Sequence, residues 1–313
     1  MTTDRTAQPA PAGLSGDFAS TSPDHGKISF TAKLVALGRS YTDIPFAPDV
    51  SELVGAPRVA AALGSSAGPE LEDFAWLAPL VEARYKSIVA AIKRSGINQV
   101  LEFASGVSLR GLAMVQQDPD LTYVESDLSA LTLEKLSILE TIRNRYSLRP
   151  ARNHHIRIAN ILAWDEIERA LAPLDADRPV IIVHEGLFMY LSRAEKDAAA
   201  ANVKRVLARH GGIWITPDFS PLSQSGWDLT DNPAFGQMLS AIEAQTGRSF
   251  AAASFADERD VAAFVAQHGF EATMHAQIDG SYELSSLAAS GITAEAQARL
   301  GTALKIWEMR LRG

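Results

Sequence analysis

Between residues 99 and 217, apolar segments of strand length alternate with stretches of helical periodicity, and this alternation constrains the fold more than any other feature. Strands are predicted at 99–103, 122–126, 155–159, 180–184 and 213–217, and helices near 107–117, 130–146, 164–172 and 193–209. Downstream, a helix is predicted at 258–267 and strands at 270–276 and 305–312. Alternating strands and helices predict an α/β fold with a doubly wound, mostly parallel sheet.

The segments before the first strand predict a helical cap. Residues 1–28 combine Pro and Gly with Ser, Thr and Ala, and we expect a mobile arm there. The arm lacks the apolar and basic regions of a signal peptide, so a cytoplasmic protein is expected. Apolar residues recur at helical spacing over 29–96, the predicted cap, and 97–313 is the predicted α/β domain. An insertion at about 218–249 is expected to cover the substrate.

Composition excludes several classes of function. The chain has 29 Lys and Arg against 37 Asp and Glu, and a net charge of −8 argues against nucleic acid as a partner. No run approaches the roughly 18 apolar residues of a membrane span, so no membrane partner is expected. The absence of cysteine excludes disulfides, thiolate zinc sites and a cysteine nucleophile.

The first predicted strand ends in a turn of small residues, Ala104-Ser105-Gly106, followed by a helix start. In a doubly wound sheet, ligands bind at the carboxyl ends of the strands, so we expect a ligand there. The dinucleotide pattern G-x-G-x-x-G fails, because only Gly106 and Gly111 are glycines. Glu102 would repel a pyrophosphate and favour a cationic ligand, and S-adenosyl-L-methionine, with its sulfonium and ammonium, fits.

The ends of the next strands supply further candidate contacts. Asp127 ends the second strand, where an acid can bind a ribose diol, although NAD sites use a similar acid. After the third strand, Asn160 could offer its side chain to the adenine amine and Ile161 could pack on the adenine face. The fourth strand ends in His184-Glu185-Gly186.

The chain resembles the leucine carboxyl methyltransferase family, which includes bacterial polyketide O-methyltransferases, in the segments 100–112, 123–129 and 183–191. His184-Glu185-Gly186-Leu187-Phe188-Met189-Tyr190-Leu191 is similar to the family's glutamate-glycine-x-x-methionine-tyrosine-leucine signature. Thr31-Ala32 through Arg39 resembles its N-terminal segment, and Arg84 its arginine ahead of the first strand. The resemblance spans roughly residues 29–217. It implies a class I methyltransferase fold, which is Rossmann-like with a seven-stranded sheet and an N-terminal helical cap.

The resemblance also implies roles for individual residues. Arg84 would hold the cofactor's carboxylate, Glu102 and Gly106 its methionine moiety, and Asp127 its ribose. The full set expected to bind the cofactor is Arg84, Glu102, Ala104, Gly106, Asp127, Leu128, Asn160, Ile161 and Glu185. Two departures stand out: the family's threonine and aspartate after the arginine are absent at 85–88, and Val107-Ser108 replaces leucine-aspartate.

The methyl acceptor decides whether a general base is needed. A carboxylate, with a pKa of about 4, is ionised at neutral pH, whereas a phenol, with a pKa of about 10, needs a general base to remove its proton. His184 is the best-placed base among the histidines, Tyr190 could position an acceptor, and no spacing predicts a metal site.

We therefore expect an S-adenosylmethionine-dependent O-methyltransferase acting on a carboxylate or phenolic hydroxyl of a small molecule, such as a polyketide-like or other secondary metabolite. The residues Trp227, Phe235 and Met238 suggest an apolar substrate cover. Two alternatives remain open: an NAD-type oxidoreductase and a non-catalytic S-adenosylmethionine-binding protein of the same fold.

Overall fold

The computed structural model describes residues 25–67, 74–219, 233–247, 249–288 and 290–313. Within these residues the chain forms one seven-stranded sheet in the order β3-β2-β1-β4-β5-β7-β6. The strands are β1 (Gln99–Phe103), β2 (Thr122–Asp127), β3 (His154–Ile158), β4 (Val180–His184), β5 (Gly212–Thr216), β6 (Phe270–Ala276) and β7 (Lys305–Leu311). The first five pair in parallel, and β7 pairs antiparallel with both β5 and β6. The predicted doubly wound, mostly parallel sheet is confirmed.

Helices cover both faces of the sheet because alternate residues of each buried strand point to opposite sides. Val100, Ile181 and Ile213 pack beneath α4 (Ala78–Ser95) and α5 (Arg110–Gln117). Their strand neighbours, among them Leu101, Ile182 and Trp214, pack on the other face. That face is covered by α7 (Trp164–Leu171), α8 (Arg193–His210) and α11 (Glu258–Gln267). A sixth helix, α6 (Ser129–Arg145), packs beside β2 and β3.

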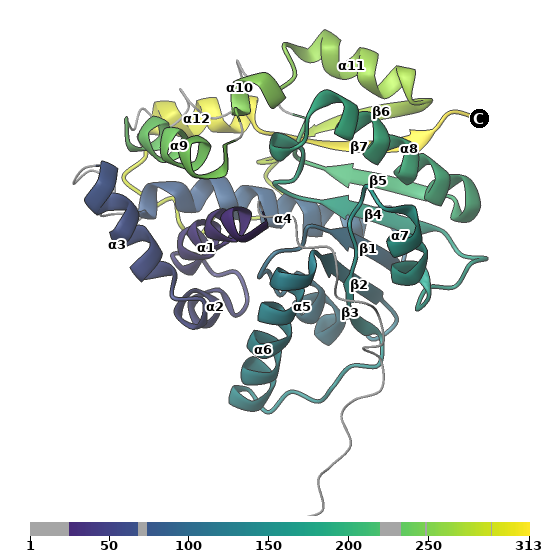
Figure 1. Cartoon of the computed structure of the whole chain (residues 1–313), viewed down its shortest axis with the longest axis horizontal. Helices are drawn as coiled ribbons and strands as arrows, with labels where there is room; N and C mark the ends of the chain where they lie inside the picture. Colours follow the sequence, from purple (N-terminus) through teal and green to yellow (C-terminus); the bar gives the residue numbers. More distant parts are fainter. Residues whose placement is uncertain (1–24, 68–73, 220–232, 248, 289) are drawn as a thin grey trace, which may run out of the picture.

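A second helical group gathers over the carboxyl ends of the parallel strands (Figure 1). It contains α1 (His25–Ser40), α2 (Ala47–Leu53), α3 (Ala56–Ala67), η2 (Ala75–Leu77), α9 (Pro233–Thr246), α10 (Phe250–Ala253) and α12 (Ala294–Ala303). Elements from both ends of the chain share one apolar cluster, in which Leu34 and Leu77 meet Leu239, Phe250 and Leu300. The cap is therefore built jointly by N-terminal helices and later segments.

Local sequence signals explain several element boundaries. A capping box at Ser192 begins α8, and Gly96 ends α4 with a left-handed φ of 68°. Asp257 caps α11 by accepting from the backbone N–H groups of Arg259 and Asp260. The helix predicted from residue 107 begins only at Arg110, because the turn after β1 extends that far. Helix α1 begins at His25, inside the segment predicted as an arm, and residues 1–24 lie outside the described residues.

Candidate functional site

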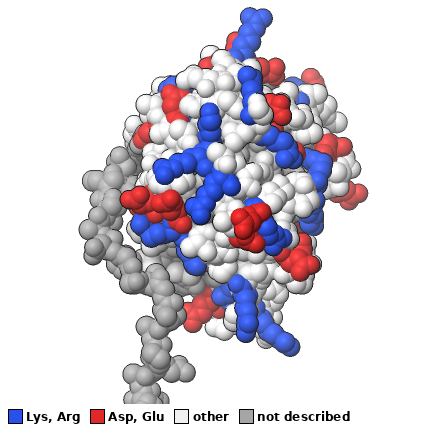
Figure 2. All heavy atoms as spheres, turned by 90° about the vertical axis from the view of Figure 1, so that its right-hand side faces the viewer, with Lys and Arg blue, Asp and Glu red and all other residues white. Residues whose placement is uncertain are grey.

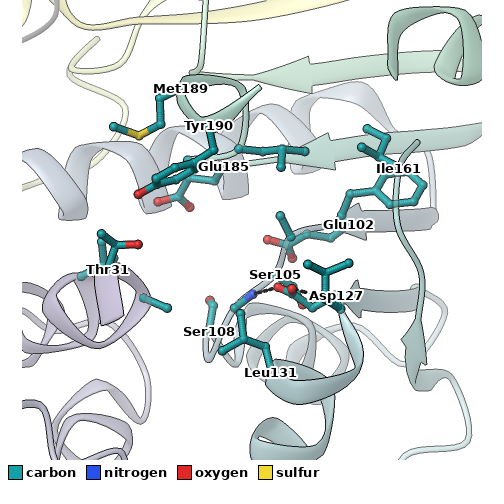
Figure 3. A pocket seen from close by; sticks show the side chains of 18 of the residues that line it. Thr31, Glu102, Ser105, Ser108, Asp127, Leu131, Ile161, Glu185, Met189 and Tyr190 are labelled. Carbon is teal, nitrogen blue, oxygen red and sulfur yellow. Dashed lines mark hydrogen bonds between the residues drawn. The ribbon is translucent and has the colours of Figure 1, made fainter. Parts of the chain in front are cut away.

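A cavity of about 350 Å³ lies at the carboxyl ends of β1, β2, β3 and β4, closed on one side by α1 (Figure 3). We call it the strand-end cavity. It lies where β1 and β4, neighbours in the sheet, lead into helices on opposite faces, the position at which doubly wound sheets bind ligands. All nine residues expected to bind a cofactor line it: Arg84, Glu102, Ala104, Gly106, Asp127, Leu128, Asn160, Ile161 and Glu185.

The turn after β1 is held in a conformation that brings its backbone to the cavity. Ala104 and Gly106 have positive φ values of 51° and 54°. The Gly106 N–H donates to Asp127 Oδ2 at 2.7 Å, and the Leu128 N–H donates to Asp127 Oδ1 at 2.7 Å. Behind the turn, the buried Lys135 ammonium donates to Ser105 Oγ at 2.7 Å. Asp127 thus ties the ends of β1 and β2 together at the cavity wall.

The acids at the strand ends are paired with arginines, which changes the electrostatic argument made from the sequence. Arg110 is fully buried and bridges the carboxylates of Glu102 and Glu185. Arg39 donates to the other oxygen of Glu185 at 2.7 Å, and the Tyr123 hydroxyl donates to Glu102 at 2.6 Å. Sequence reasoning treated Glu102 as a free charge that selects a cation. Its charge is instead compensated by Arg110, so that selection argument is weaker than the sequence suggested.

The carboxylate of Glu185 stays ionised in this network. Burial raises its pKa, but the charges of Arg39 and Arg110 outweigh burial, and the net direction is down. Arg39 and Arg110 were not assigned to the site from the sequence. Arg39 appeared only as the end of a family-like segment, and the pairing of Arg110 with two distant acids requires the folded chain.

The third strand contributes a turn suited to a flat, partly polar ligand. The Leu162 N–H donates to Asn160 Oδ1 at 3.0 Å, and the Asn160 N–H donates to Glu166 Oε2 at 2.8 Å. Because Oδ1 already accepts a bond, Nδ2 of Asn160 is the group left to contact a ligand. Ile161 is buried beside it and adds an apolar surface.

A second cavity of about 160 Å³ lies under the cap and adjoins the strand-end cavity. We call it the cap cavity. Thr31, Val35, Arg84, Met189 and Tyr190 line both cavities. Its other walls are largely apolar: Leu34, Leu77, Leu80, Val81, Met238, Leu239, Ile242, Phe250, Phe255 and Leu304. Met238 is therefore in the expected apolar cover, whereas Trp227 and the side chain of Phe235 lie outside the described residues.

Arg84 is half-buried where the two cavities meet. Among the described residues, its guanidinium makes no ion pair within 4.0 Å, although Glu185 and Asp218 lie near enough for its charge to lower both of their pKa values. A planar, charged donor without a fixed carboxylate partner suits an anionic ligand group.

His184 does not reach either cavity. Its ring is fully buried at the end of β4 and stacks on Phe188 with 4.5 Å between ring centres. Nδ1 lies 2.8 Å from Asp218 Oδ2, and Nε2 is enclosed. This placement does not support the predicted role of His184 as a general base, because a base must reach the proton that it removes.

The Asp218 carboxylate instead organises the loop after β4. It accepts hydrogen bonds from His184 and from the backbone N–H groups of Gly186, Leu187 and Phe188. Burial raises the pKa of Asp218, but these bonds and nearby positive charge bring it to about 2. Asp218 was placed by the sequence only at the edge of an insertion, and nothing local signalled its bonds to a loop 30 to 32 residues earlier.

Tyr190 lies between the two cavities, facing Thr31 of α1 (Figure 3). The two side chains are hydrogen-bonded, and the Tyr190 ring meets Phe250 edge-on at 5.7 Å. Burial raises the pKa of the Tyr190 phenol to about 12. The phenol is therefore neutral near pH 7, which fits the predicted positioning of an acceptor and not proton abstraction.

The leucine carboxyl methyltransferase family model matches residues 72–204. A DUF574 family protein from Streptomyces avermitilis is 14% identical, with 90% of this chain and 97% of that chain covered and a TM-score of 0.56. A putative O-methyltransferase from Nostoc punctiforme is 12% identical, with 92% and 70% covered and a TM-score of 0.45. PigF with SAH is 13% identical, with 82% and 60% covered and a TM-score of 0.47. No curated protein matches the chain significantly.

Proposed function

We propose that this S-adenosylmethionine-dependent methyltransferase, whose residues 72–204 match the leucine carboxyl methyltransferase family model, methylates a carboxylate of a small apolar molecule. The resemblance read from the sequence is thus confirmed. The observation that carries the proposal is the apolar cap cavity, which adjoins the strand-end cavity at Thr31, Arg84 and Tyr190.

The donor set of the strand-end cavity fits S-adenosylmethionine. Its volume of about 350 Å³ lies within the range of small-molecule sites. Asp127 would bind the ribose hydroxyls, while Nδ2 of Asn160 and the side chain of Ile161 would contact the adenine. Arg84 would hold the cofactor's carboxylate, and Glu185 would accept from its ammonium. When bound, the cofactor supplies a methyl group activated by its sulfonium.

The acceptor would enter the cap cavity with its reacting oxygen toward Tyr190 and Thr31. Apolar walls on α1, α4 and α9 would desolvate the rest of the molecule. The Tyr190 hydroxyl would orient the oxygen, since a neutral phenol can donate a hydrogen bond. Alignment and the exclusion of water are what such a displacement needs most from the protein.

A carboxylate acceptor is favoured over a phenol because no general base among the described residues suits the cap cavity. His184 is enclosed, Tyr190 is a neutral phenol, and Asp218, with its pKa near 2, is occupied by four hydrogen bonds. Lys196 also lines the cavity, but its ammonium is held as a donor by the backbone oxygens of Leu191 and Ala253. A carboxylate needs no base. Its oxygen forms the bond to the methyl carbon as the carbon–sulfur bond breaks, sulfur keeps the electron pair, and no proton moves.

The experiment supplies methyl-labelled S-adenosylmethionine with matched aromatic acids and phenols, such as 3-phenylpropanoate and 4-ethylphenol. We expect label in a methyl ester, which alkali releases as methanol. Label only in an alkali-stable ether would overturn the carboxylate proposal in favour of a phenol.

Calorimetry with S-adenosylmethionine and with NAD distinguishes the remaining alternatives. S-adenosylmethionine binding without transfer to any acceptor would indicate a non-catalytic binding protein. Binding of NAD alone would indicate an oxidoreductase.

A further inference from the structure

We infer that the side chain of Gln277 accepts a hydrogen bond from the molecule that receives the methyl group. The preferred substrate is then an apolar carboxylic acid that also carries a hydroxyl group. This inference rests on the proposed function, because it takes the cap cavity as the acceptor site. Gln277 lies outside residues 72–204, the part of the chain that matches the family.

The backbone places Gln277 firmly at the cavity wall. It follows β6 directly, and its N–H donates to Leu304 O at 2.8 Å, which extends the β6–β7 pairing by one residue. Its side chain is 1% exposed and lines the cap cavity. Nε2 donates to Lys305 O at 2.8 Å. Because a flipped amide would set Oε1 against that carbonyl oxygen, this bond identifies Oε1.

Oε1 of Gln277 has no hydrogen-bond partner in the described part of the chain. Buried side-chain oxygens almost always accept a hydrogen bond, so this one, at a cavity wall, is available to a donor that enters the cavity on a ligand. The atom is an acceptor and carries no charge. Its complement is therefore a neutral donor, of which a hydroxyl is the simplest.

The protein groups around the cap cavity do not supply that donor. The Lys196 ammonium donates to the backbone oxygens of Leu191 and Ala253. Asp218 only accepts, and Arg84 lies where the cavity meets the strand-end cavity. The remaining lining is mostly apolar. A volume of about 160 Å³ is close to that of an apolar cavity that holds one benzene ring, roughly 150 Å³. We therefore expect a ring-sized acid with one hydroxyl.

The experiment compares 3-phenylpropanoate with its 2-, 3- and 4-hydroxyphenyl relatives. Binding is measured by calorimetry with S-adenosylhomocysteine present, and ester formation is measured with S-adenosylmethionine. For one hydroxyl position we expect about tenfold tighter binding and higher kcat/KM than for the parent acid, the effect typical of satisfying one buried acceptor.

Three variants assign that preference to Gln277. Gln277→Met should bring the ratio between hydroxylated and parent acid close to one. Gln277→Glu should keep the ratio, because a buried, protonated carboxyl can still donate to Lys305 O and accept from the ligand. Gln297→Met, on the exposed side of α12, should leave it unchanged. If Gln277 only held the Lys305 backbone in place, its replacement would slow the reaction of both acids equally. A change in the ratio therefore shows that Gln277 recognises the hydroxyl group.

The outcomes divide cleanly. The inference is overturned if acids are esterified without preference for any hydroxyl position, or if the preference survives Gln277→Met. Either result leaves the proposed function standing. Phenols methylated in place of acids, or no binding of any acid, overturn the proposed function together with the inference.

Discussion

At the scale of single residues, the two cavities differ in how firmly their polar groups are fixed. In the strand-end cavity, Asp127 and Glu185 are held by backbone N–H groups or by arginines, so they present preorganised acceptors. Arg84, at the meeting point of the two cavities, has no ion pair within the described residues. This contrast makes Arg84 the residue whose binding role is simplest to test.

Replacing Arg84 by Ala should weaken S-adenosylmethionine binding by roughly 10- to 100-fold, because it removes charge-assisted hydrogen bonds to a carboxylate. Arg84→Lys should recover only part of the affinity, since an ammonium cannot make two coplanar bonds. Calorimetry measures both, with Arg209→Ala on the exposed end of α8 as a control. Equal affinity in Arg84→Ala and the unaltered protein would refute the assignment.

Lys196 predicts how acceptor binding depends on pH. It lines the cap cavity, and burial lowers its pKa to about 8. Below pH 8 it is cationic and attracts a carboxylate, and above pH 8 it becomes neutral. The KM of a carboxylic acid should therefore rise roughly three- to tenfold between pH 7 and 9, as for loss of one partly screened charge. In Lys196→Met the KM should be high at both pH 7 and pH 9. A KM that does not change with pH in the unaltered protein would contradict the prediction.

At the scale of elements, the sequence was sufficient wherever the signal is local. The strands β1, β4 and β6 have the predicted bounds. For β1 and β4 the signal is a short, mostly apolar segment, and β6 begins directly after the helix-ending Gly269. The residues that line the strand-end cavity were also accessible from the sequence, since parallel strands bring their carboxyl ends to one edge. What could not be predicted depends on distant pairs, such as Arg39 with Glu185 or His184 with Asp218.

The loss of His184 as a candidate base illustrates the limit. Its position at the carboxyl end of β4 was read correctly, but the position does not say which way the ring points. Phe188 and Trp214 enclose it, and those contacts depend on the packing of the loop after β4 against β5. Gln277 could not be found from the sequence for a similar reason, because the lack of a partner is a property of the folded interior.

The capping box of α8 is a local signal whose energetic effect can be measured. Ser192 Oγ accepts from the Glu195 N–H, and Glu195 Oε2 accepts from the Ser192 N–H at 2.7 Å. Ser192→Ala should lower the free energy of unfolding by about 1 kcal/mol, and Ser192→Asp, which keeps an acceptor, should lose much less. Urea unfolding followed by circular dichroism tests this, and indistinguishable midpoints for the three proteins would contradict it.

At the scale of the whole molecule, charged side chains of both signs share the surface, whereas several carboxylates inside the protein are held by cations or hydroxyl groups. Lysine and arginine are interspersed with aspartate and glutamate over the face in Figure 2. Exposed pairs of this kind contribute little to stability. Inside, Lys135 and His154 flank the Glu125 carboxylate, and Glu82 accepts bonds from Ser285 and Ser286. Among the helices of the described residues, none is long and apolar enough to cross a membrane.

These buried carboxylates predict how stability depends on pH. Burial alone would raise the pKa values of Glu82, Glu125 and Asp218, but hydrogen bonds and positive neighbours lower each to about 2. A carboxylate with a folded pKa below its unfolded value stabilises the protein above the unfolded pKa, near 4, and loses that contribution as pH falls toward 2. The contribution of these three carboxylates to stability should therefore be flat from about pH 7 to 5 and fall steeply below 4.5. Asp218→Asn should remove on the order of 2 kcal/mol of this dependence, as expected for one such shift, whereas Glu140→Gln on the exposed side of α6 should not change it. Urea unfolding at half-unit steps of pH gives the slope, and parallel curves for Asp218→Asn and the unaltered protein would show that Asp218 titrates alike in both states.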